Sequence, residues 1–242
     1  MQWQQTGVLL SVKRHGETSA IVDVFTREHG RWKGLVRGGR SRTMRPVLQP
    51  GNVVEATWRA RLADHLGVFS IEPVSFRAAR LIDEPLKLAG LTALTELTQI
   101  LPEREAHARV YDAMQIVLDA LDDDDMWPAL LVRWELGLLD DLGYGLDLSS
   151  CVATGANDNL IYVSPKSARA VSASAGEPYR QKLLALPPFL TGAGVGAPST
   201  ADIVNGFMLT GYFLNRHLFA ARGIAAPESR GWIIDRLKRK TT

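Results

Sequence analysis

The hydrophobic period of this chain changes once, near Ala79, and the change separates two kinds of structure. Before it, apolar and polar residues tend to alternate, which is the pattern of a half-buried strand. After it, apolar residues recur every three to four positions, which is the pattern of a helix. The sequence therefore predicts an α+β protein with a β domain over residues 1–80 and an α-helical domain over residues 81–242.

Five short strands separated by turn signals are predicted before that change. β-branched and aromatic residues are frequent in the strands, and Gly, Asn, Asp or Pro residues lie between them. The expected strands cover residues 6–14, 19–26, 31–37, 52–62 and 67–76. The connection after the third strand is the longest, which is typical of an OB-fold. We predict an N-terminal OB-fold β-barrel, with an SH3-like barrel as the alternative.

Four longer helices are predicted after the change of period. Their apolar residues share one helical face, and Pro102 and the Gly143-Tyr144-Gly145 run end two of them. The expected helices cover residues 85–101, 103–121, 127–142 and 200–221, with a further helical turn or two near 230–240. Residues of about 146–198 show neither period, apart from a short hairpin with strands at 160–163 and 170–172. We interpret them as a small irregular insertion in the helical domain.

A basic stretch from Arg27 to Pro50 joins the second, third and fourth expected strands. It holds seven Lys or Arg residues against one acid, Glu28. The planar donor fork of arginine matches the oxygens of a phosphate group. We expect this stretch to bind nucleic acid, and the alternative is a solvated basic loop without a ligand. The candidate phosphate-contacting residues are Arg31, Lys33, Arg37, Arg40, Arg42 and Arg45.

Strand alternation assigns the residues of the third strand to two faces. Arg31, Lys33 and Leu35 share one face, while Trp32 and Val36 share the other. The alternation predicts that the cations face solvent and that Trp32 packs in the barrel interior. The alternative role for Trp32 is to stack against a base.

Two further segments imitate ligand sites without meeting their requirements. Four consecutive aspartates at 122–125 lack the spacing of a calcium loop, and we interpret them as a solvated helix start. The glycine-rich run at 191–197 is neither GxGxxG nor a Walker A loop, and we interpret it as a linker. The sequence therefore predicts no nucleotide or calcium site in either segment.

The single cysteine, Cys151, excludes an intrachain disulfide and argues against a cysteine-based zinc site. It has no histidine nearby in sequence, and the five histidines lack metal-ligand spacing. We expect no enzyme activity, no cofactor and no metal. The N-terminus lacks the pattern of a signal peptide and no apolar run approaches membrane-spanning length, so we expect a cytoplasmic protein with no membrane partner.

Three motifs, in their order and spacing, resemble the RecO family of bacterial DNA repair proteins. The first is GLVRGGR at 34–40, followed by Ser41-Arg42 and by LQPG at 48–51. The second is ELGLLDDLGYG at 135–145, and the third is LDLSSCVATG at 146–155. The resemblance covers almost the whole chain. It implies an N-terminal OB-fold and a helical domain with a zinc-ribbon-like insertion.

The resemblance also implies function and partners. Proteins of this family are recombination mediators without enzyme activity that bind single- and double-stranded DNA and anneal complementary strands. They work with RecR and often RecF, recognise the C-terminal tail of the single-strand binding protein SSB, and help to load RecA. The zinc-binding members carry paired CxxC motifs, whereas this chain has Thr154 where the partner of Cys151 would lie and has no second pair. The resemblance therefore implies a degenerate insertion without zinc.

The charge distribution agrees with the expected binding of DNA. Residues 1–80 hold thirteen Lys/Arg and six Asp/Glu, a net +7; residues 81–160 hold four and sixteen, a net −12; residues 161–242 hold eleven and four, a net +7. An acidic middle repels DNA and would confine binding to the barrel and to a basic C-terminal face. That face would include Arg216, Arg222, Arg236, Lys238 and Arg239.

Three other functions remain as alternatives. The protein could be an adaptor that acts mainly through contacts with SSB and RecR, with DNA binding secondary. It could be an RNA-binding OB protein. A hydrolase or nucleotide-binding enzyme is the alternative with least support in the sequence.

Overall fold

The computed structural model describes residues 1–62, 64–123, 125–192 and 196–240. The chain packs into two compact units, Met1–Asp123 and Asp124–Thr242. Each unit is described separately below. The domain boundary expected after residue 80 stays a prediction.

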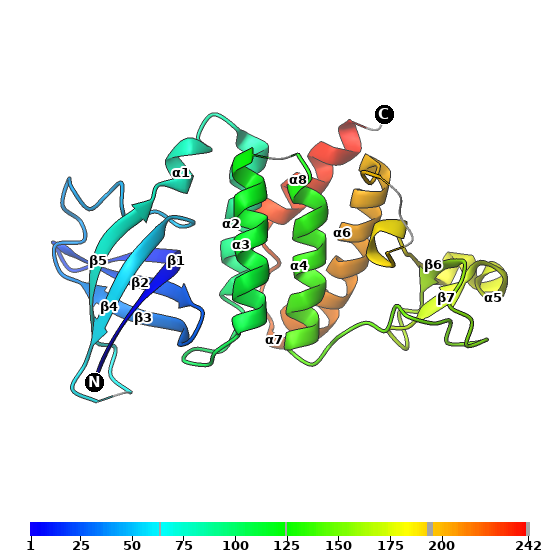
Figure 1. Cartoon of the computed structure of the whole chain (residues 1–242), viewed down its shortest axis with the longest axis horizontal. Helices are drawn as coiled ribbons and strands as arrows, with labels where there is room; N and C mark the ends of the chain where they lie inside the picture. The colour runs from blue at the N-terminus through cyan, green and yellow to red at the C-terminus, as the bar shows by residue number, and fades with distance from the viewer. Residues whose placement is uncertain (63, 124, 193–195, 241–242) are drawn as a thin grey trace. The chain divides into compact units, whose positions relative to one another are not determined.

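A five-stranded barrel forms the N-terminal part of the first unit (Figure 1). Its strands close in the order β1-β2-β3-β5-β4, and all neighbours are antiparallel except β3 and β5, which pair in parallel at Leu35 and Val68. This closed order confirms the α+β class and the OB-like barrel. The strands are β1 (Gln2–His15), β2 (Ser19–Thr26), β3 (Gly30–Val36), β4 (Val53–Arg59) and β5 (Val68–Ser75).

The first strand is long enough to serve two neighbours. Its start, from Gln2 to Val8, pairs with β4, and the part from Gly7 to His15 pairs with β2. An irregularity between Leu9 and Ser11 lets the strand bend from one partner to the other. The alternate residues that point inward form the core of the barrel, which includes Leu9, Val22, Val24, Val54, Ala56, Trp58 and Phe69.

Three helices complete the first unit: α1 (Arg77–Arg80), α2 (Pro85–Thr98) and α3 (Ala108–Asp123). The helix expected from residue 103 begins five residues later. Residues 99–107 run instead alongside β3, where Glu103 bridges to Arg31, and Arg104 has a positive φ of 65° that a helix does not allow. Contacts with β3 therefore outweigh the helical pattern of this segment.

Asp122, the first residue of the aspartate run, does not lie in a solvated helix start. Asp122 belongs to the last turn of α3, where it is half-buried and receives hydrogen bonds from Arg77 and, at 2.8 Å, from Arg80. Two cations of α1 thus neutralise this carboxylate, which corrects the expectation for Asp122. Asp124 lies outside the described residues, as do residues 193–195 of the glycine-rich run.

The second unit contains the remaining helices and a small sheet. The strands form a three-stranded sheet in the order β7-β6-β8, which confirms the expected hairpin. The expected helix 200–221 is interrupted by a π-helical turn, η3, and the last helix covers more residues than expected. The principal elements are α4 (Trp127–Asp141), β6 (Leu160–Val163), β7 (Ala170–Ser172), β8 (Leu184–Ala185), α6 (Thr200–Leu214), η3 (Asn215–Phe219), α7 (Ala220–Arg222) and α8 (Glu228–Arg239).

A buried ion pair links three helices of the second unit. Arg230 of α8 donates from Nε to Oε1 of Glu135 of α4 over 2.7 Å, and from Nη2 to the carbonyl of Phe207 in α6 over 2.6 Å. Removing either charge would leave the other buried without its partner, which is strongly destabilising. Among the described residues, no helix has both the length and the apolar character needed to cross a bilayer.

Candidate nucleic-acid interface

The cations of the basic stretch fall into two halves that differ in their partners. The first half holds Arg27, Arg31 and Lys33, and the second holds Arg37, Arg40, Arg42 and Arg45. In the first half, each cation contacts a carboxylate of the first unit. The Nε of Arg27 lies 2.8 Å from Oδ1 of Asp112, and Lys33 pairs with Glu103. Arg31 pairs with both Asp23 and Glu103. Acids of the helical part of this unit thus neutralise much of this half.

Arg31 is buried, with 7% of its surface exposed. Its Nε lies 3.0 Å from Oδ2 of Asp23, and its Nη2 lies 3.1 Å from Oε1 of Glu103. Its Nη1 donates to the carbonyls of Gln99 and, at 2.6 Å, Leu101, just after the C-terminal end of α2. The expectation that Arg31 faces solvent is wrong, because residues 99–107 cover this part of β3.

The carboxylate that Arg31 contacts is itself buried. Burial raises the pKa of Asp23 to about 6, against the lowering effect of the Arg31 and Lys33 charges. Glu103 contributes a further repulsion that raises it. The cluster of Asp23, Arg31, Lys33 and Glu103 therefore fastens residues 99–107 to the outer face of β2 and β3.

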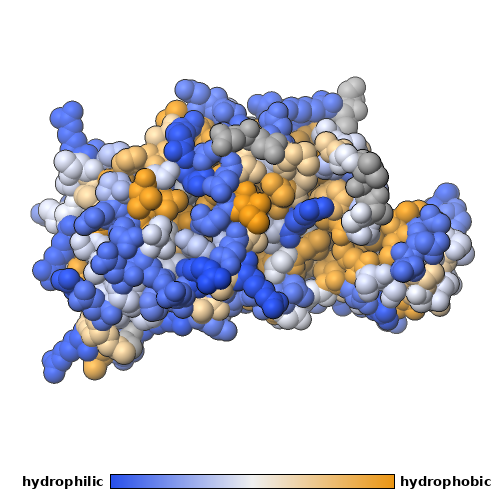
Figure 2. All heavy atoms as spheres, viewed as in Figure 1, coloured by the Kyte–Doolittle hydropathy of each residue, from blue (hydrophilic) through white to orange (hydrophobic). Residues whose placement is uncertain are grey.

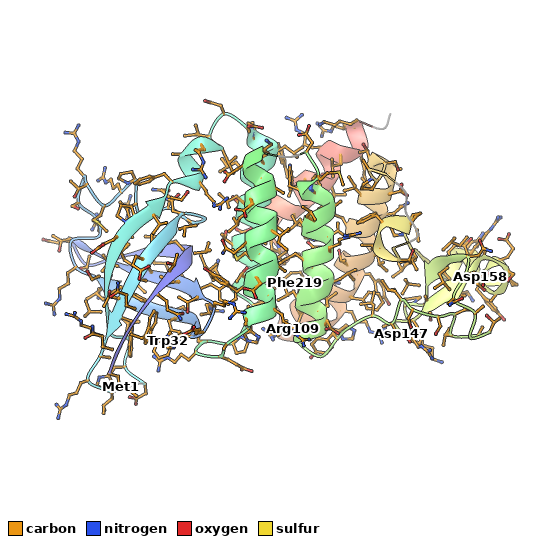
Figure 3. All side chains as sticks on the ribbon, in the orientation of Figure 1. Met1, Trp32, Arg109, Asp147, Asp158 and Phe219 are labelled. Carbon is orange, nitrogen blue, oxygen red and sulfur yellow. The ribbon has the colours of Figure 1, made fainter. Side chains whose placement is uncertain are left out.

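Trp32 is the next residue of β3, and Figure 3 labels it in the barrel. It is half-buried and packs against the barrel core, with its ring at 4.5 Å from that of Trp58. Its indole Nε1 donates to the carbonyl of His29 over 2.7 Å, and the guanidinium of Arg104 lies 4.8 Å from the ring centroid. The interior position of Trp32 is confirmed, and these contacts argue against base stacking.

The second half of the stretch is open. Arg37, Arg42 and Arg45 are exposed, and no ion pair joins them to an acid of the described chain. Arg40 is half-buried, and its Nη1 donates to the carbonyl of Gly16 over 2.6 Å. Hydrophilic residues prevail over the part of the surface where Figure 1 shows the barrel (Figure 2). Within the described chain, these four arginines are the part of the basic stretch that has no acidic partner.

Backbone contacts fix the connection that carries these arginines. The Arg40 N–H donates to the carbonyl of Thr18 over 2.9 Å, which ties the connection to the β1–β2 hairpin. The side chain of Asn52 donates to the carbonyls of Pro46 and Val47 at 2.9 and 3.0 Å. The side chains of Val47 and Leu48 are buried in the barrel core. The connection therefore presents its cations from a defined backbone.

The structure adds a cation that sequence analysis missed. Arg14, near the end of β1, lines a groove of about 390 Å³ together with Arg40 and Arg45. It lies outside the basic stretch, so the charge cluster gave no signal for it. The pairing of β1 with β2, which brings residue 14 opposite Ala20, is the feature that places it there.

Two family models match this chain, one after the other along the sequence. The family model described as Recombination protein O N terminal matches residues 1–77, and the one described as Recombination protein O C terminal matches residues 83–223. The DNA repair protein RecO of Methylorubrum extorquens is 54% identical over 235 residues, covering 95% of this chain and 96% of its own. The protein of the same name from Rhizobium etli is 54% identical over 230 residues, covering 95% and 90%.

This chain belongs to the RecO family. The N-terminal RecO match spans the barrel and the whole basic stretch, and the C-terminal match ends before α8. The fold expected from the motifs, an OB-like barrel followed by helices, is confirmed.

The cations expected on a C-terminal basic face all lie in the second unit and are exposed. Arg216 donates to the carbonyl of Pro165 over 2.5 Å, and the guanidinium of Arg236 lies 5.1 Å from the ring centroid of Trp232. Lys238 and Arg239 share the last turn of α8 with Arg236, and Arg222 ends α7. Whether this set binds DNA stays a prediction.

Cys151 lies in the segment that resembles the zinc-ribbon-like insertion of RecO proteins. It is buried, and its Sγ accepts the N–H of Ser172 over 3.3 Å. Burial opposes ionisation, but hydrogen bonds from Ser172 and Thr154 lower the pKa of the thiol to about 6. Among the described residues, no three His, Cys, Asp or Glu side chains are grouped so that they could hold a metal. The residues around Cys151 therefore do not fit a zinc site.

Proposed function

We propose that this protein acts in DNA repair and homologous recombination as a mediator that binds single- and double-stranded DNA and anneals complementary strands. The observation that supports the proposal is the set of four arginines, Arg37, Arg40, Arg42 and Arg45, which have no acidic partner among the described residues. Membership of the RecO family, whose relatives here are named DNA repair proteins, gives the biological setting.

In this proposal the two halves of the basic stretch have different roles. The four open arginines contact phosphates with little base specificity. Lys33 contributes charge near them, whereas Arg31 supports the strand that carries the stretch. Neutralised strands repel each other less, and contacts that exchange easily allow bases to test their pairing. Annealing by this route needs no covalent chemistry, and so we propose no enzyme activity and no cofactor.

The proposed partners follow from the family. They are the C-terminal tail of SSB, RecR, in many cases RecF, and RecA, which is loaded on SSB-coated single strands. The proposed location is the cytoplasm, where repair brings the protein to the nucleoid. An SSB tail is acidic with an apolar end, so its binding site must combine an apolar pocket with cations.

The test is a titration of single-stranded oligonucleotide across a salt series. We expect the Arg37→Ala/Arg40→Ala/Arg42→Ala variant to bind more weakly. The negative slope of log K against log salt should become shallower by about 2, because each phosphate contact contributes roughly −0.7. The matched control is Lys166→Ala/Arg180→Ala/Lys182→Ala, which removes three charges from the second unit. An unchanged affinity and slope in the first variant would exclude this connection as the DNA site.

The adaptor alternative makes a different prediction. If the purified protein binds an SSB tail peptide but does not accelerate annealing of complementary strands, its main role is protein contact. Tighter binding to RNA than to DNA of matched sequence would favour the RNA-binding alternative. ATP hydrolysis above background would favour an enzyme.

A further inference from the structure

The face by which OB-folds commonly bind oligonucleotides is closed in this barrel. That face lies on strands 2 and 3 of the fold. Here the outward residues Asp23, Phe25 and Arg31 are 1%, 0% and 7% exposed. The ring of Phe25 contacts that of Tyr111 in α3 with centroids 5.4 Å apart, and Arg31 binds the segment after α2. A DNA strand could reach this face only if the first unit opened.

A groove elsewhere on the same barrel has the features that the closed face lacks. It has a volume of about 390 Å³ and lies where the β1–β2 hairpin meets the connection between β3 and β4. Three guanidinium groups, those of Arg14, Arg40 and Arg45, line it. Small-molecule sites in proteins start at about 300 Å³, so the groove is large enough for a compact ligand.

Apolar side chains complete the groove. Val12, Ala20 and Leu48 line it between the cations, and the last two are also members of the barrel core. A ligand that combines anionic groups with a flat or apolar part could use both kinds of lining. A nucleotide has this composition, with a phosphate for arginine donors and a base for the apolar surface.

We propose that this groove binds one unstacked nucleotide of single-stranded DNA, with its phosphates on Arg14, Arg40 and Arg45 and its base against Val12, Ala20 and Leu48. The inference rests on the proposed DNA-binding function and gives it a specificity. A base inside a duplex is paired and stacked, so it cannot enter the groove without unpairing. Arg14 therefore favours single strands, whereas the exposed Arg37 and Arg42 serve both forms of DNA.

The experiment compares Arg14→Ala with Lys13→Ala, which removes the same charge from the next residue along β1, outside the groove. Affinities are measured for a single-stranded thymidine oligonucleotide and for a hairpin duplex at one salt concentration. We expect Arg14→Ala to weaken single-strand binding about tenfold and duplex binding by less than about twofold, because a charge-assisted hydrogen bond is lost only with the single strand. Lys13→Ala should change both affinities equally and slightly.

A second variant tests the apolar part of the groove without changing charge. Val12→Phe fills the groove from a half-buried position, and thermal unfolding shows whether the barrel remains folded. In the folded variant we expect weaker single-strand binding and unchanged duplex binding.

The outcomes separate the two proposals. The nucleotide-groove proposal is wrong if Arg14→Ala lowers the affinities for single-stranded and duplex DNA by the same factor, as Lys13→Ala does. It is also wrong if Val12→Phe leaves the affinity for single strands unchanged. Displacement of the oligonucleotide by a polyglutamate peptide at equal charge concentration would also overturn it, because the groove would then select charge alone. If the Arg37→Ala/Arg40→Ala/Arg42→Ala variant bound DNA as tightly as the wild type, that result would instead overturn the proposed function itself.

Discussion

Arg31 and Arg45 lie in the same basic stretch, but the fold uses them in opposite ways. Arg31 is buried among two carboxylates and two carbonyl oxygens, and Arg45 is exposed beside a groove. The difference comes from residues 99–107, which supply the Glu103 carboxylate and two backbone carbonyls to Arg31. Arg45 has no acidic partner among the described residues. A count of cations therefore overstates an interface wherever another segment of the chain supplies acids. The predictions below test this contrast between a covered half and an open half.

The largest expected loss of unfolding free energy comes from comparing two glycines, one in each half of the basic stretch. Gly30 in the covered half and Gly38 in the open half have φ values of 69° and 67°. A Cβ on Gly30 would lie 1.7 Å from the carbonyl oxygen of Glu105, whereas one on Gly38 meets no atom within 4 Å. We expect Gly38→Ala to cost about 1–2 kcal/mol from backbone strain alone. Gly30→Ala should cost more than about 4 kcal/mol, since backbone must also move.

Urea unfolding of both glycine variants measures the difference. Equal free energies of unfolding for the two variants would show that residues 99–107 do not pack against β3 in solution. That result would remove the reason for calling this half covered.

Replacing Arg31 tests the same packing through its charge. Arg31→Ala leaves Asp23 buried without its ion-pair partner, and we expect a loss of about 3 kcal/mol in unfolding free energy. The control is Arg27→Ala, whose pair with Asp112 is exposed and screened by solvent, so we expect its loss to change the unfolding free energy little. If both variants lose the same small amount, Arg31 is not a buried anchor. The DNA affinity of folded Arg31→Ala should remain close to that of the wild type.

The smallest expected effect is a pH dependence that belongs to Asp23. Its pKa in the folded protein is about 6, above the usual value of 3.8, so the folded state holds a proton that the unfolded state releases. The stabilising contribution is complete below pH 4 and is lost as pH rises through 6, a change of about 1–3 kcal/mol. Relative to Asp23→Asn, the wild type should therefore become less stable between pH 4 and 7. A constant difference across this range would contradict the raised pKa.

Local patterns were enough to predict much of the barrel. Alternation over parts of the strands located all five and placed Trp32 inside, although β1 is irregular between Leu9 and Ser11. The same alternation put Arg31 on the outer face correctly, but it could not show that this face is covered. That cover depends on a contact between Gly30 and Glu105, which are far apart in the sequence.

The errors in the helical part have a related cause. Residues 103–107 have a helical pattern, yet α3 does not include them. Glu103 pairs instead with Arg31 and Lys33. Asp122 was expected in solvent, but Arg77 and Arg80 bind it. Arg14 was missed as a candidate because pairing between strands, rather than its neighbours in sequence, brings it to Arg40 and Arg45. Long-range ion pairs and strand register are the two features that single-sequence patterns do not contain.

Arg37, Arg40, Arg42 and Arg45, which pair with no acid in the described part of the chain, have a consequence for the free protein. Like charges held on one fixed connection repel each other, and this repulsion lowers the stability of the folded first unit when no anion is present. Salt screens the repulsion, and any bound polyanion removes it more completely. Because a ligand that binds only the folded state stabilises it by mass action, the melting temperature becomes a measure of occupancy. If the basic connection binds DNA as proposed, the melting temperature of the first unit should rise when DNA is added.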